Sequence, residues 1–407
     1  MSAAIPAEPS PSLPKPMAEL AAHLESLGHA TYWVGEGLTE ALLGRSPAGY
    51  CLVTEAEPVE LIDALPTAVP TRPGGRAFMV PSEAGPVDLA PLARGTRIED
   101  HLALRGFRLL AMAWRPRSQE WIDPESGLED LRNSRLCSVA EPEADLRRSP
   151  RRVLQAARLA AALQLQVDPP VEAAMADVFP TRCRNVPACE LRHELNRLLL
   201  TENPAPGVDL LRRTGADVVL GLAGREDSAR LIASAPPDLG LRWFIWLRDS
   251  RGSRTLRRLR INLELAGRIQ RLLAAHPVEQ RLPRRRHHTL RRGFERIGHA
   301  DCEKLIELRR QELESVEGDV AENSRSELEA LALAFAAEVE EAAREESKIT
   351  PVLAGRQVMA LLGLGPSPRV GAALAFLDER VNADPSCNTE ASLDALLRDW
   401  AAENPED

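Results

Sequence analysis

The chain has 407 residues, of which 44% are hydrophobic and 27% are charged. This length and composition predict about two to four packed units and exclude a chain too polar to form a core. No run of about 18 apolar residues occurs, and the first residues lack the basic and then apolar order of a signal peptide. We therefore expect a cytoplasmic protein without a membrane span.

Charge is distributed unevenly along the chain. The formal net charge is −9, which disfavours uniform coating of a nucleic acid. Residues 251–296 contain 14 Arg and three Glu, so this segment carries a net charge of +11 and the rest of the chain carries −20. A basic segment in an acidic protein predicts a contact surface for a polyanion such as RNA.

The six cysteines form no metal-binding or disulfide pattern. No Cys-x-x-Cys pair occurs, and no histidine stands at zinc-ligand spacing from a cysteine pair. We therefore expect reduced, mostly buried thiols and no metal site.

The order of strand and helix signals divides the chain. Residues 1–16 are rich in Pro, Ala and Ser, which predicts a flexible leader. From residue 17 to about residue 140, short strands alternate with short helices, so we expect an α/β or α+β head. From Pro150 onward strand signals almost vanish, and one of the helices that we expect covers residues 256–275.

Residues 32–54 have the form of a nucleotide-binding strand, turn, helix and strand. The first strand runs into Gly35, and the helix places Leu38 and Leu42 on one face before Gly44 ends it. The second strand follows directly. This order predicts the scaffold of a nucleotide site.

Five segments, taken in order, resemble the bacterial class II CCA-adding tRNA nucleotidyltransferase and poly(A) polymerase family. The segments are VGEGLTEALLGR (34–45), WIDPESGLEDLRN (121–133), RRVLQAARLAAALQLQVDP (151–169), ACELRHELNRLLLTENPAPGVDLLRRTG (188–215) and ITPVLAGRQVMALLGLGPSPRVG (349–371). The resemblance implies an α+β fold, in which a nucleotidyltransferase (polymerase-beta-like) head with a mixed sheet precedes an all-helical neck, body and tail. The implied boundaries are 17–145 for the head, 146–225 for the neck, 226–349 for the body with the basic segment, and 350–407 for the tail.

The resemblance also implies where catalysis would take place. The family holds two Mg²⁺ with a D-x-D pair on one strand and a third carboxylate on a neighbouring strand. In this chain the pair positions are Gly49 and Cys51, and Asp88 stands where the third carboxylate is expected. Glycine has no ligand atom and a thiol is a poor ligand for a hard cation, so we expect no two-metal site. Asp88 remains the candidate catalytic residue, and Mg²⁺ is expected only if the chain is active.

The family's phosphate-binding and base-reading positions are also changed. The second glycine of the opening turn is Glu36 and a family arginine is Thr39, and both changes weaken phosphate binding. The acid pair of the base-reading motif is replaced by Arg148 and Ser149. An equally good interpretation of the retained arginines is that each holds a buried acid such as Asp88. The residues expected to remain at a nucleotide or phosphate pocket are Gly35, Arg105, Arg152 and Arg158.

The densest basic stretch covers residues 281–298. One interpretation is contact with the phosphates of a tRNA backbone, and the other is a solvated face that pairs with nearby acidic helices. We favour RNA contact, because the family's body and tail bind tRNA. The expected contact residues are Arg284, Arg285, Arg286, Arg291 and Arg292.

Three functions are consistent with these residues. The preferred one is a catalytically inactive relative that binds tRNA or a similar structured RNA. The second is an active enzyme that adds CCA or A residues with a relocated metal site. The third is a regulatory subunit that binds an active paralogue through the acidic helices of residues 303–346.

Overall fold

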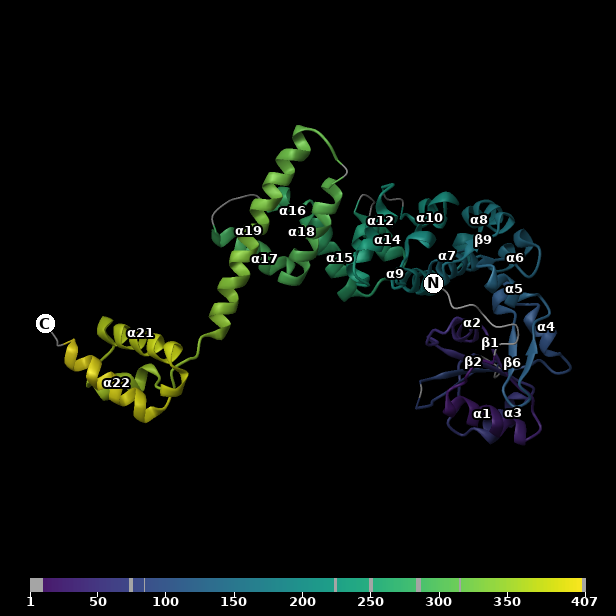
Figure 1. Cartoon of the computed structure of the whole chain (residues 1–407), viewed down its shortest axis with the longest axis horizontal. Helices are drawn as coiled ribbons and strands as arrows, with labels where there is room; N and C mark the ends of the chain where they lie inside the picture. The colour runs from purple at the N-terminus through teal and green to yellow at the C-terminus, as the bar shows by residue number, and fades with distance from the viewer. Residues whose placement is uncertain are drawn as a thin grey trace. The chain divides into compact units, whose positions relative to one another are not determined.

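The computed structural model describes residues 10–404, except 73–75, 84, 223–224, 249–251, 283–286 and 315. Figure 1 shows the helices and strands of the chain in sequence order by colour. Contacts divide the chain into two compact units. One unit comprises Met1–Pro277 and Glu307–Ser315, and the other comprises Val278–Ile306 and Val316–Asp407. In the described part of the chain, no helix is long and apolar enough to cross a membrane.

A seven-stranded mixed sheet forms the first part of the first unit, as expected from the sequence. Across the sheet the strands follow the order β3-β4-β5-β2-β1-β6-β7. Strands β2 and β5 run parallel, whereas the other paired strands are antiparallel. The strands are β1 (Thr31–Val34), β2 (Tyr50–Thr54), β3 (Val69–Pro70), β4 (Phe78–Val80), β5 (Val87–Pro91), β6 (Ala113–Arg115) and β7 (Glu120–Ile122).

Both faces of this sheet are buried, so alternate residues of a strand enter different cores. Trp33 and Leu52 belong to one core, while Val34 and Val53 belong to the other. The helices that accompany the sheet are α1 (Lys15–Ser26), α2 (Glu36–Leu42), α3 (Pro58–Ala64), α4 (Ile98–Leu102) and α5 (Gly127–Arg132).

Helices dominate the first unit after the sheet. A two-stranded parallel pair of β8 (Arg135–Leu136) and β9 (Gln166–Val167) is the strand structure in this part of the described chain. The helices are α6 (Pro142–Arg148), α7 (Arg152–Leu163), α8 (Pro169–Arg182), α9 (Ala188–Leu199), α10 (Ala205–Arg213), α11 (Ala216–Leu220), α12 (Ser228–Ser234), α13 (Leu239–Leu247), α14 (Gly252–Arg258) and α15 (Leu263–Ala275).

The prediction of a single helix over residues 256–275 is wrong. Helix α14 ends at Arg258, and Arg260 has a positive φ of 51°. The Asn262 side chain then accepts a hydrogen bond from the backbone N–H of Leu265, 2.9 Å away, and so caps α15. The break at Arg260 and the asparagine cap divide residues 256–275 between two helices.

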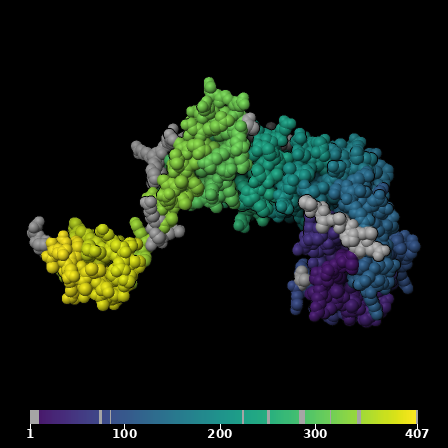
Figure 2. Space-filling model, in the orientation of Figure 1, coloured from purple at the N-terminus to yellow at the C-terminus, as the bar shows by residue number. Residues whose placement is uncertain are grey.

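The second unit is helical throughout its described residues. Its last three helices enclose a core that includes Val358, Leu377 and Leu397, and Figure 2 shows these helices in yellow as one packed lobe. Helix α18 begins in this unit and ends in the first unit. The helices are α16 (Val278–Arg281), α17 (His287–Ile297), α18 (His299–Glu314), α19 (Asp319–Ser347), α20 (Gly355–Leu362), α21 (Pro368–Ala383) and α22 (Glu390–Glu403).

Candidate functional site

The parallel strands β2 and β5 bring Gly49 and Cys51, where the sequence predicts the family's metal-binding pair, beside Asp88. Cys51 is the register partner of Asp88, and Gly49 lies two residues before Cys51, directly ahead of β2. All three residues line one cleft with a volume of about 390 Å³. The structure therefore brings these three residues together.

The donor groups in this cleft do not fit a pair of Mg²⁺ ions. Asp88 is exposed, but Gly49 supplies no ligand and Cys51 supplies sulfur, which Mg²⁺ binds poorly. Two further acids line the cleft, yet Glu36 is held by arginines, and Glu40 accepts a hydrogen bond from the Ala48 backbone N–H at 2.7 Å. Among the described residues no group of three or more His, Cys, Asp or Glu side chains is placed to hold a metal ion.

Arg105 also lines this cleft, where it packs over the turn at Gly35. Gly35 has a φ of +82°, and a Cβ atom there would lie 2.8 Å from an Nη atom of Arg105. Arg105 Nη2 lies 3.3 Å from His101 Nε2 and 4.0 Å from Cys51 Sγ. Burial, together with the charge of Arg105, lowers the pKa of His101 from 6.5 to about 4, so this ring is neutral at neutral pH. The structure thus places two of the expected pocket residues, Gly35 and Arg105, in contact.

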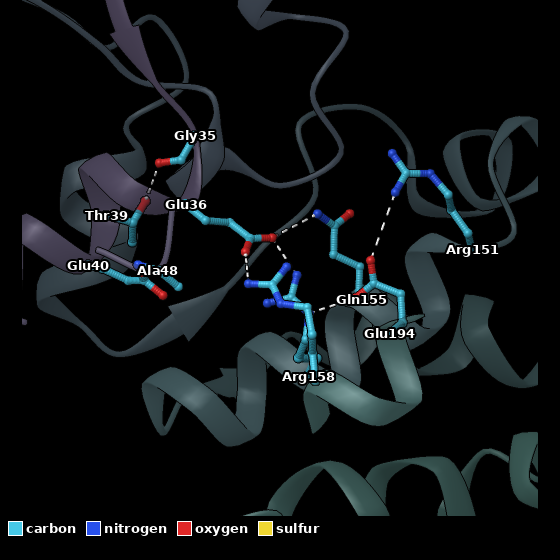
Figure 3. A network of polar contacts seen from close by, with 10 residues as sticks. Gly35, Glu36, Thr39, Glu40, Ala48, Arg151, Gln155, Arg158 and Glu194 are labelled. Carbon is cyan, nitrogen blue, oxygen red and sulfur yellow. Dashed lines mark hydrogen bonds and ion pairs between the residues drawn. The ribbon is translucent and has the colours of Figure 1, made fainter. Parts of the chain in front are cut away.

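Glu36 lies at the centre of an ionic network that joins the head to the helices (Figure 3). Its Oε1 accepts a hydrogen bond from Nη2 of Arg158 on α7, and its Oε2 accepts one from Nη2 of Arg197 on α9 at 2.8 Å. Arg158 in turn donates from Nε to Glu194 Oε2 at 2.6 Å. Burial opposes ionisation of Glu36, but Arg158 and Arg197 outweigh it and lower the pKa of this carboxyl from 4.5 to about 2.

Arg152 is likewise held by groups of the protein itself. Its guanidinium donates to the buried carboxylate of Asp145 and, at 2.7 Å, to the backbone oxygen of Leu104. Arg148 donates to the same carboxylate at 2.8 Å. Arg152 and Arg158 thus have acidic partners, as one of the two interpretations expected, but these partners are Asp145, Glu36 and Glu194, not Asp88.

The expected RNA-contact residues fall into two groups. Arg284, Arg285 and Arg286 lie outside the described residues. Arg291 Nε lies 3.2 Å from Glu295 and 3.3 Å from Glu338 of α19, whereas Arg292 is exposed on α17. Arg291 therefore fits the second interpretation of the basic stretch, in which its side chains pair with nearby acidic helices.

Sequence reasoning missed three members of the Glu36 network: Gln155, Glu194 and Arg197. The first is one helical turn before Arg158, and the other two are one turn apart on α9. A usable signal was present, because Arg158 stands among the alanines and leucines of an apolar helix. A buried arginine in such a helix requires an acidic partner on a neighbouring element.

A second cleft, of about 570 Å³, lies at the other end of β2. There Tyr32 donates a hydrogen bond to Glu55 at 3.3 Å, and burial with the nearby Glu55 raises the pKa of the tyrosine to about 12. Glu57, Glu99 and Glu120 also line this cleft. Arg94, Arg97 and Arg115 line it as well, so its charge is mixed, and none of the residues expected at the nucleotide pocket belongs to it.

Part of the helical region matches a family model for RNA binding. Residues 164–220 match the family described as "Probable RNA and SrmB- binding site of polymerase A". These residues include helices α8 to α11 of the first unit.

Nearly the whole chain is similar to enzymes that extend tRNA. It is 31% identical over 399 residues to the A-adding tRNA nucleotidyltransferase of Deinococcus radiodurans, a match that covers 82% of this chain and 88% of the relative. Its fold resembles the CCA-adding enzyme of Bacillus stearothermophilus in complex with CTP, with 20% identity, a TM-score of 0.65 and coverage of 96% and 99% of the two chains. It also resembles the Thermotoga maritima CCA-adding enzyme complexed with tRNA, with 17% identity, a TM-score of 0.58 and coverage of 94% of both chains.

Proposed function

This chain belongs to the class II CCA-adding and A-adding tRNA nucleotidyltransferase family, and we propose that it is a tRNA-binding member that has lost nucleotidyl transfer. One observation carries the proposal. Gly49 and Cys51, where the resemblance predicts the metal-binding pair, line one cleft with the exposed carboxylate of Asp88. A single carboxylate with a thiol does not hold the two Mg²⁺ that activate a hydroxyl and stabilise a leaving pyrophosphate.

The changes around this cleft support the same proposal. Arg152, the retained arginine of the base-reading motif, is already bonded to Asp145. An arginine held by a buried carboxylate offers fewer donors to the edge of a nucleotide base. Loss of the metal ligands and loss of the base-reading groups thus coincide in one chain.

The tRNA-binding half of the proposal has separate support. Residues 164–220 match a family model for RNA binding, and residues 251–296 carry a net charge of +11. We place phosphate contacts on Arg284, Arg285, Arg286, Arg291 and Arg292, with Arg292 as the exposed member among those that the structure describes.

Electrophoretic binding to tRNA at several salt concentrations tests this half. We expect affinity to fall steeply with salt, because each phosphate contact releases a counterion. Arg292→Glu should weaken binding. It should also reduce the steepness of log K against log salt by about one, the change expected for the loss of one phosphate contact. Lys15→Glu makes the same charge change on the exposed surface of α1 and should leave binding unchanged. Absence of binding at low salt, or an equal effect of the two variants, would reject the contact surface.

The second candidate is an active enzyme that adds CCA or A residues with a relocated metal site. It is favoured by the A-adding relative and by the exposed carboxylate of Asp88 in the cleft. Incubation of tRNA lacking its 3′ end with labelled ATP or CTP and Mg²⁺ or Mn²⁺ separates the two candidates. The proposed function predicts no incorporation, whereas incorporation that Asp88→Ala abolishes would establish the second candidate.

A further inference from the structure

We propose that Arg158, Arg197 and Gln155 form an anion-binding site that the chain fills with its own Glu36 carboxylate. This internal occupant keeps phosphate groups out of the neighbouring cleft. The inference deepens the proposed function and rests on it, because it gives a second reason, independent of metal, why this cleft does not take a nucleoside triphosphate.

The donors converge on a single oxyanion. Oε1 of Glu36 accepts from Arg158 Nη2 and, at 3.4 Å, from Gln155 Nε2, while Oε2 accepts from Arg197 Nη2 at 2.8 Å. Figure 3 shows Glu36 extending from α2 towards Gln155 and Arg158. Guanidinium groups that approach an oxyanion from several sides are the arrangement by which proteins bind phosphate.

The local charge balance depends on Glu36. Arg158 has a side chain that is only 3% exposed and shares its charge between Glu36 and Glu194. Arg197 has no ion pair other than the one with Glu36 in the part of the chain that the structure describes. Without the Glu36 charge, Arg197 would lose its ion pair, and Arg158 would share Glu194 with Arg151, whose Nη1 lies 3.9 Å from Glu194 Oε1. A partly buried excess positive charge is costly, so such a site attracts an anion.

The site is accessible from the cleft that contains Asp88. Glu36 and Arg197 both line that cleft, and their side chains are 22% and 35% exposed. Arg105 lines it as well and supplies a further guanidinium. An anion with two linked phosphates can therefore reach both Arg197 and Arg105 in this cleft, which Glu40 and Asp88 also line.

A purely structural role for Glu36 is the competing explanation. The carboxylate would then serve only to tie α2 to α7 and α9, and its removal would weaken the fold without creating affinity for anions. The two explanations agree on the contacts and differ in what the variant binds.

Equilibrium dialysis with inorganic pyrophosphate, in the absence of metal and RNA, decides between them. The wild-type chain is compared with Glu36→Gln, which removes the charge and keeps the shape. The matched control is Glu40→Gln, because Glu40 lines the same cleft and bonds to the backbone N–H of Ala48. We expect Glu36→Gln to bind pyrophosphate roughly tenfold or more tightly than wild type, and Glu40→Gln to bind as weakly as wild type.

A stability measurement keeps the test decisive if Glu36→Gln folds poorly. A ligand that binds the folded state raises the unfolding temperature. The unfolding temperature of Glu36→Ala should therefore be higher in pyrophosphate than in sodium chloride of equal ionic strength. Adding Arg197→Gln to Glu36→Ala should remove this stabilisation. Equal pyrophosphate affinity in wild type and Glu36→Gln, or no stabilisation of Glu36→Ala, would overturn the inference. Nucleotidyl transfer by the wild-type chain would instead contradict the proposed function. It would not change the result of the pyrophosphate-binding measurement.

Discussion

Glu36 couples the stability of the folded chain to pH. Its pKa is 4.5 in the unfolded chain and about 2 in the folded one, because the attraction of Arg158 and Arg197 outweighs burial. A carboxyl with a lowered folded pKa contributes stability that is fully present above pH 4.5 and is lost as the pH falls towards 2.

We therefore expect Glu36→Gln to lower the free energy of unfolding by about 1–3 kcal/mol at neutral pH. The difference between the two proteins should shrink as the pH falls from 4.5 towards 2, because the carboxyl binds a proton in the unfolded chain over this range before it does so in the folded one. Urea denaturation of both proteins over this pH range measures the difference. A difference that stays constant below pH 4.5 would contradict the assigned ion pairs.

The sequence could identify Glu36 as unusual but could not identify its partners. Its departure from glycine is visible in residues 34–45, whereas Arg158 and Arg197 lie 122 and 161 residues further along the chain. Pairing over such distances depends on how α2, α7 and α9 pack, and no local pattern records that packing. Gly49, Cys51 and Asp88 could be grouped beforehand, because strand periodicity and the family motif order place them on neighbouring strands.

At the scale of single elements, Asp145 holds α6 against the start of α7. Its side chain is 2% exposed and contacts both Arg148 and Arg152. A buried carboxylate between two guanidinium groups is needed for both to remain in place.

Asp145→Asn should therefore destabilise the fold by about 2–3 kcal/mol, since the amide keeps an acceptor but loses the charge. Glu143→Gln is the matched control, because Glu143 lies on the same helix and its pair with Arg147 is about half exposed. The control should change the stability by less than about 0.5 kcal/mol. Chemical denaturation measures the free energy of unfolding of both variants. Equal losses would show that the buried ion pairs of Asp145 stabilise the fold no more than the exposed pair of Glu143.

The ends of β2 and β5 offer a direct test of the lost metal site. A side chain at Gly49 would meet nothing within 4 Å of its Cβ, so Gly49→Asp fits the backbone there. Combined with Cys51→Asp, it would place two carboxylates on one side of β2, opposite Asp88.

We expect this double variant to bind Mn²⁺ roughly tenfold or more tightly than wild type, as electron paramagnetic resonance would show. Adding Asp88→Asn to the double variant should reduce the affinity again. Tight Mn²⁺ binding by the wild-type chain would mean that the metal ligands are elsewhere.

Helix boundaries were predictable wherever local chemistry sets them. Gly35 and Gly44 both have positive φ and flank α2, as the sequence indicated. The break between α14 and α15 was not predicted from the sequence, because apolar residues recur at helical spacing on both sides of the capping residue Asn262. A capping residue can start a new helix within a segment whose apolar residues keep a helical spacing, so both signals have to be considered together.

At the scale of the whole molecule, the mixed sheet followed by helices was predictable because the ordered motifs span most of the chain. The division into two units was not, since α18 begins in one unit and ends in the other. Contacts between segments distant in sequence define that division. The segment matched to RNA binding lies in the first unit, and α17 with Arg292 lies in the second.

One sample can test both halves of the proposed function together. The protein is mixed with tRNA lacking its 3′ end, ATP, CTP and Mg²⁺ or Mn²⁺, and the RNA is analysed on a native gel and on a denaturing gel. We predict that the tRNA is shifted on the native gel while its length on the denaturing gel is unchanged. Extension of the bound tRNA by A or CCA, lost in Asp88→Ala, would contradict the account.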